Sequence, residues 1–318
     1  MKLIQRGADM KRFVRFFAVI LMVFVGGGHA WAETPLPVFV SIVPQQYFVQ
    51  QIGKDNVDVS VMVQPGASPA TYEPKPLQMT KLSKARLYFS IGVPFETFWL
   101  DKIASANPDM TIVHTDKGIE KQPMDVHHHE GEYQAGHHDD KALAEEDHDL
   151  ENDHGHAGLD PHIWLSPKLV KTQAGHILAA LAAADPENKD FYTTNYNVFI
   201  KKVDVLDQNL ARMLKDKEGM QFMVFHPSWG YFARDYNLKM IPIEIEGKNP
   251  KPAKLQKLIE HAREESIKVI FVQPQFSTKS AELVAREIHG QVLRADPLAL
   301  DWLENMKKMA AQFKEVLK

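Results

Sequence analysis

Short apolar segments rich in β-branched residues alternate with longer segments of helical periodicity along this chain of 318 residues. The segments that predict strands are residues 38–43, 57–63, 87–91, 111–113, 222–225, 240–245, 268–272 and 291–295. The segments that predict helices are residues 77–85, 167–184, 186–215, 252–265, 279–289 and 298–318. Such an alternation indicates parallel sheets covered by helices, because parallel strands need a crossover connection.

The alternation is interrupted by one long helix and then restarts. We therefore predict an α/β fold of two Rossmann-like lobes joined by a long rigid helix, with the lobes at residues 33–185 and 217–318 and the helix at 186–216. Ser166 is a suitable N-cap and Pro167 a suitable first residue for the helix that they precede. Ligands of open α/β sheets bind outside the carboxyl ends of the strands, so polar residues there are candidates for a site.

The first 32 residues have the parts of a secretory signal. Lys11, Arg12 and Arg15 precede an apolar run at 16–25, and Ala30-Trp31-Ala32 forms a cleavage site. The run is shorter than the roughly 20 residues that span a bilayer. We expect cleavage after Ala32, with translation starting at Met1 or Met10, and hence a periplasmic protein with no stable membrane insertion. An uncleaved anchor is the alternative.

The chain contains no cysteine. This excludes disulfides, a lipid-modified cysteine anchor and thiolate metal ligands, so any metal must be bound by His, Asp, Glu or water. The formal net charge is −4, and no basic stripe predicts nucleic-acid binding.

A histidine-rich and acidic tract at residues 125–156, here called the His-rich loop, contains almost no apolar residues. Its histidines are His127, His128, His129, His137, His138, His148, His154 and His156. Neutral imidazole is the commonest metal ligand near pH 7, and such tracts indicate metal binding by composition. We expect a disordered loop that attracts metal; an acidic loop that is merely solvated is the alternative.

Four segments outside the loop place polar residues beside predicted strand ends and turns. They are Pro65–Pro74, Asp160–Pro167, Phe225–Ala233 and Arg294–Leu298. Together they resemble the solute-binding proteins of zinc and manganese ABC importers, the ZnuA/TroA type, over essentially the whole mature chain. The resemblance implies one metal bound between two lobes, and an ABC permease as the membrane partner.

The resemblance also implies which residues bind the metal. By position, His162 is the ligand from the first lobe, and His226 and Asp296 are the ligands from the second. Manganese members usually have a carboxylate where His226 stands, so imidazole there favours Zn²⁺ over Mn²⁺. The family's first ligand is a histidine, but Ala70 occupies that position here.

Ala70 has no donor atom, and tetrahedral zinc needs four donors. Water is the simplest replacement, while Glu73, Tyr72, His154 and His156 are side chains that could swing in. Each proposed ligand also has an ordinary structural interpretation: His162 can cap a turn, His226 can be a satisfied core residue, and Asp296 can be a turn residue or helix cap.

The sequence therefore predicts a monomeric periplasmic zinc-binding protein that delivers Zn²⁺ to an ABC permease and is not an enzyme. A zinc buffer or metallochaperone without a permease, and a binder of another small solute, are the alternatives. Three ligands plus water is also a catalytic pattern, but the chain has no His-Glu-x-x-His motif, and Glu73 is the only nearby candidate for a general base.

Overall fold

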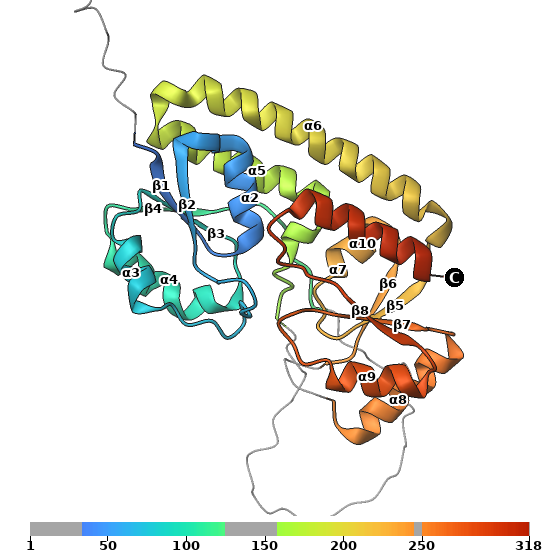
Figure 1. Cartoon of the computed structure of the whole chain (residues 1–318). Helices are drawn as coiled ribbons and strands as arrows, with labels where there is room; N and C mark the ends of the chain where they lie inside the picture. Colours follow the sequence, from blue (N-terminus) through green and yellow to red (C-terminus); the bar gives the residue numbers. More distant parts are fainter. Residues whose placement is uncertain (1–33, 125–157, 245–249, 318) are drawn as a thin grey trace, which may run out of the picture. The chain divides into compact units, whose positions relative to one another are not determined.

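Within residues 34–124, 158–244 and 250–317, which the computed structural model describes, the chain forms two four-stranded sheets that are parallel throughout (Figure 1). The predicted signal at 1–32 and the His-rich loop, with His154 and His156, lie outside these residues. Among the helices described, none is long and apolar enough to cross a membrane.

The first sheet has the strand order β2-β1-β3-β4. Its strands are β1 (Leu36–Val40), β2 (Val57–Val61), β3 (Leu87–Ser90) and β4 (Thr111–His114). Helices α2 (Val43–Gly53) and α5 (Pro167–Ala184) pack on this sheet, and α3 (Pro76–Leu82) and α4 (Pro94–Ala106) pack against each other on the opposite side (Figure 1). Helices therefore cover both faces, which is why β3 is buried along its whole length.

The second sheet repeats the pattern with the order β6-β5-β7-β8. Its strands are β5 (Gln221–Val224), β6 (Lys239–Pro242), β7 (Val269–Val272) and β8 (Gln291–Arg294). The helices of this half are α7 (Gly230–Asp235), α8 (Pro252–Glu264), α9 (Lys279–Glu287) and α10 (Trp302–Val316). In both sheets the strand order reverses beside the first strand, which is where ligands bind in open α/β folds.

Helix α6 (Lys189–Leu214) follows a short 3₁₀ turn at Pro186–Asn188 and contacts both halves of the chain. It packs on α2 and α5 at one end and on α10 at the other. From Phe199 onward every third or fourth residue of α6 is buried, which is the pattern of a helix with one apolar face. The predicted fold class, two α/β lobes with a long helix, agrees with this arrangement.

Several predictions were wrong at the ends of their elements; those of 77–85 and 240–245, for example, end at Leu82 and Pro242. Residues 38–43 are not a single strand, because β1 ends at Val40 and helix α2 begins at Val43 with Pro44 in its first turn. The last helix begins at Trp302 and not at residue 298, where Asp301 accepts a capping hydrogen bond from Glu304 N. The predicted cap of α5 is confirmed, since Ser166 Oγ accepts a hydrogen bond from Leu169 N.

Candidate metal centre

A cavity of about 590 Å³ lies at the carboxyl ends of strands from both sheets. The residues that line it follow β2, β3, β4, β5, β6, β7 and β8 or belong to the segment before α5. They are Ser68, Pro69, Ala70, Thr71, Val93, Pro94, Met124, Pro161, His162, Trp164, His226, Glu244, Gln275, Phe276, Pro297 and Leu298. Polar groups are few among them, so the cavity has an apolar wall with a small number of placed donors.

His162 and His226 meet in this cavity although 63 residues separate them in the chain. Their ring centroids are 5.2 Å apart, and the ring planes are inclined by 73°. Two imidazoles bound through nitrogen to one tetrahedral zinc ion have ring centres about 5 Å apart, given a Zn–N distance of about 2.0 Å. The spacing of the two rings therefore suits a shared zinc ion, with each ring as one of its four donors.

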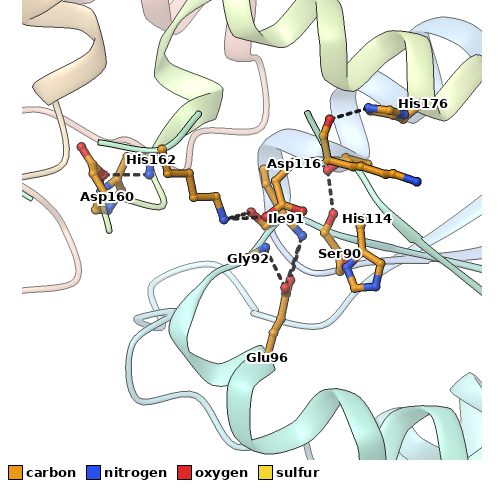
Figure 2. Close-up of polar contacts among 12 residues, drawn as sticks. Ser90, Ile91, Gly92, Glu96, His114, Asp116, Asp160, His162 and His176 are labelled. Carbon is orange, nitrogen blue, oxygen red and sulfur yellow. Dashed lines mark hydrogen bonds and ion pairs between the residues drawn. The ribbon is translucent and has the colours of Figure 1, made fainter. Parts of the chain in front are cut away.

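Each ring is also held by a carboxylate through its Nδ1 atom. His162 Nδ1 is 2.7 Å from Asp160 Oδ1 (Figure 2), and His226 Nδ1 is 2.5 Å from Glu244 Oε1. A carboxylate oxygen can accept a hydrogen bond from Nδ1–H, and the Nδ1–H tautomer has its lone pair on Nε2. Metal-bound histidines characteristically make this type of bond with their second nitrogen.

Burial keeps the His162 ring in its metal-binding form. His162 is 7% exposed, and desolvation lowers its pKa below the ordinary value of 6.5, although the neighbouring Asp160 opposes this shift. A neutral ring is the form that binds a cation, because a protonated imidazole has no lone pair to give. The ring is therefore ready to bind metal at neutral pH.

The other predicted ligands within the described residues make other contacts in the structure. Asp296 follows β8, but its Oδ1 accepts hydrogen bonds from Leu298 N at 2.9 Å and from Gln275 Nε2 at 3.3 Å, and Asp296 does not line the cavity. Glu73 is exposed, and the hydroxyl of Tyr72 donates to Gln78. Among the described residues, no group of three or more His, Asp or Glu side chains is placed to hold a metal ion. The role of Asp296 and Glu73 as ligands stays a prediction.

Ala70 lines the cavity, and its correspondence to the family's first ligand, which the resemblance implied, stays a prediction. Two residues that the sequence did not single out, Asp160 and Glu244, are the carboxylates beside the histidines. Glu244 lies two residues beyond the end of β6, a position from which polar side chains reach a site. It was overlooked because the predicted strand ran to residue 245.

A buried carboxylate shapes the loop that carries Val93 and Pro94 into the cavity wall. Glu96 is 5% exposed and accepts hydrogen bonds from Ile91 N and Gly92 N (Figure 2). Gly92 has a φ of +82°, so any other residue there would be strained, and a Cβ would also displace the end of the Lys121 side chain. The loop after β3 therefore owes its conformation to Gly92 and to Glu96.

Burial raises the pKa of Glu96 to about 7, from 4.5, despite the hydrogen bonds that favour its ionised form. The folded chain thus binds a proton more readily than the unfolded chain, and the contribution of Glu96 to stability is full below pH 4.5 and is lost as the pH rises through about 7. We expect wild type to lose roughly 2–4 kcal/mol relative to Glu96→Gln between pH 4.5 and pH 8. Urea unfolding of both proteins across this range measures the difference, and a constant difference would contradict the shift.

The fold has two parallel-sheet α/β lobes and a long helix packed on both, and two imidazoles meet in one cavity. This combination is that of the metal-binding proteins of the periplasmic solute-binding class. The chain belongs to the family described as ZnuA, zinc-uptake complex component A, periplasmic, whose model matches residues 38–316. The resemblance noted in the sequence is thereby confirmed at the level of the family.

Individual relatives agree with this assignment. The chain is 32% identical over 260 residues to the high-affinity zinc uptake system protein ZnuA of Bacillus subtilis (strain 168), which is 80% of this chain and 75% of that protein. A crystal structure of ZnuA matches with a TM-score of 0.76 and 42% identity, over 89% of this chain and all of the other. A 138–173 deletion mutant of ZnuA with zinc bound matches with a TM-score of 0.76 and 41% identity, over 89% of this chain and 98% of the other.

Proposed function

We propose that this protein captures Zn²⁺ in the periplasm and delivers it to an ABC permease for import. The observation that carries the proposal is the pair of His162 and His226, which face one cavity at the spacing of two ligands on one tetrahedral ion. Zinc is therefore the cargo, and two imidazoles favour it over Mn²⁺, which prefers oxygen donors. The family and the zinc-bound ZnuA structure support the same cargo.

We infer transport and not catalysis. The general base that the sequence offered, Glu73, is exposed and does not line the cavity.

Residues 1–32 serve in this proposal as a signal that is cleaved after Ala32, and the mature protein acts as a monomer. N-terminal sequencing of the periplasmic protein should begin at Glu33.

Uptake of radioactive zinc by the native host tests the transport proposal. Deleting the gene should lower the initial rate of uptake at limiting zinc, and wild type should restore that rate while His226→Ala should not. A zinc buffer or metallochaperone, the function that Ala70 keeps under consideration, would leave the initial rate unchanged. That outcome would contradict delivery to a permease.

Because Ala70 has no donor atom, one coordination position of the ion lacks a protein ligand, and we propose that water occupies it. Ala70→His should then tighten zinc binding by roughly tenfold or more, because a third imidazole replaces a water ligand at a position that lines the cavity. Competition with a chromophoric chelator measures the change. The gain should vanish in the double variant Ala70→His/His162→Ala, and an unchanged affinity in the single variant would show that position 70 does not face the bound ion.

A further inference from the structure

Glu244 is the carboxylate that lies beside the paired histidines on the side of the second sheet. It is 4% exposed, lines the cavity and has its Oε1 2.5 Å from His226 Nδ1. Its other oxygen, Oε2, is buried and has no hydrogen-bond partner in the described part of the chain. A buried carboxylate is costly to keep, so a role for its charge at this place is to be expected.

The backbone fixes where this carboxylate stands. Ile243 N donates to Val224 O at 2.9 Å and Glu244 N donates to Phe225 O at 3.0 Å, so the chain after β6 stays hydrogen-bonded to the chain after β5. This pairing brings residue 244 beside residue 226 whatever the side chains are. The contact between Glu244 and His226 is therefore built into the sheet and does not depend on a flexible loop.

His226 is held from two further directions. Its backbone N–H donates to Gln273 Oε1 at 3.2 Å, and its carbonyl accepts from Gln273 Nε2 at 2.6 Å. Its ring stacks on Phe276, with centroids 4.9 Å apart and planes inclined by 26°. These contacts fix the main chain and the ring plane, but neither decides which ring nitrogen carries the proton. In the described part of the chain, the contact that reaches a ring nitrogen of His226 is the one with Glu244.

We propose that Glu244 is a positioning residue that holds His226 in the Nδ1–H tautomer, with its Nε2 lone pair open to the cavity. This inference rests on the proposed function, because the freed nitrogen is the one that would bind zinc. Asp160 makes the matching contact with His162 in the segment before α5, so each ring has a carboxylate beside its Nδ1. Carboxylates in this role strengthen metal binding by orienting the ring and raising its basicity.

The tautomer of His226 in the metal-free protein is the direct test. Nitrogen-15 NMR of the imidazole should show Nδ1–H in wild type and a shift toward Nε2–H in Glu244→Ala, whereas Glu244→Gln, which keeps an acceptor oxygen, should stay near wild type. Glu264→Gln, on the exposed side of α8, is the matched control for loss of one negative charge. An unchanged His226 tautomer in a folded Glu244→Ala protein would overturn the proposal.

Zinc affinity and Co²⁺ absorption complete the test. We expect Glu244→Ala to weaken zinc binding by about 10–100-fold, the usual cost of losing the hydrogen-bond partner of a ligand, with Glu244→Gln intermediate and Glu264→Gln unchanged. The visible bands of the Co²⁺-saturated protein should be the same in all variants, and altered bands in the Glu244 variants would instead make Glu244 a ligand. If wild type itself bound no zinc, the proposed function would fail while the tautomer measurement still decided the role of Glu244.

Discussion

Replacing either His162 or His226 by alanine is expected to weaken zinc binding by about 100-fold or more, beyond the 10–100-fold that follows loss of an outer hydrogen-bond partner. Each substitution removes one of two imidazoles whose centroids lie 5.2 Å apart. Among the described residues, no group of three or more His, Asp or Glu side chains is placed to hold the ion without it. Competition titration with a chelator of known affinity measures the loss.

His176→Ala is the control for this pair of variants. His176 lies on α5 and its Nε2 is hydrogen-bonded to Lys117 O at 2.9 Å, away from the cavity (Figure 2). The His176→Ala variant should bind zinc with the affinity of wild type. Equal affinities for wild type and His226→Ala would mean that the two rings pack in the cavity without binding the cargo.

The second large effect is on stability and concerns two tryptophans that tie the His162 segment to the last helix. Trp302 Nε1 donates to Trp164 O, and Trp164 Nε1 donates to Pro297 O, each at 2.7 Å. Trp302 also makes an edge contact with Phe48, and both indoles are 1% exposed. Trp302→Ala should lower the free energy of unfolding by about 3–5 kcal/mol, because it opens a large cavity and leaves a buried carbonyl unpaired.

Trp302→Phe separates the two causes. It keeps most of the ring that contacts Phe48 but loses the donor to Trp164 O, so the expected loss is about 1–3 kcal/mol. Denaturant unfolding followed by circular dichroism measures both variants. If Trp302→Ala lowered the free energy of unfolding by less than about 1 kcal/mol, the indole would not be what holds the His162 segment against α10.

Much of the fold could be predicted because its elements have strong local signals. The strands are short, apolar and bounded by turn residues, and Ser166-Pro167 marks the start of α5 by cap chemistry alone. Helices α2, α4 and α7 were not predicted, although Pro44 and Pro94 stand in the first turns of α2 and α4. In α2 the apolar run continues from the preceding strand without a break, so periodicity alone does not divide it.

Some residues of the candidate site could be predicted from the sequence, and others could not. His162 and His226 could be named from their motifs. His226 lies two residues beyond the end of β5, where ligands bind in open sheets, whereas His162 lies in the segment that leads into α5. Glu244 carries no motif and becomes visible only when β6 pairs with β5. Asp296 lies beside the end of β8 as predicted, but its Oδ1 accepts a hydrogen bond from Leu298 N in the following turn. Asp is common in turns because its side chain makes this kind of bond with the backbone two residues on.

The His-rich loop is the alternative zinc-binding site that the sequence offers. The residues that flank it are paired, so the loop can be deleted. Pro123 and Leu159 pair as an antiparallel bridge, and Met124 N donates to Gly158 O at 3.0 Å. A two-residue Asn-Gly turn can therefore replace residues 125–157 without moving either stem.

Calorimetric zinc titration of the mature protein without that loop is the most direct measurement. We predict that one tight site survives the deletion and disappears when His162→Ala is added. If all tight binding were lost with the loop while His162 and His226 were intact, zinc would bind to the loop histidines, and the cavity between the two sheets would not be the metal centre.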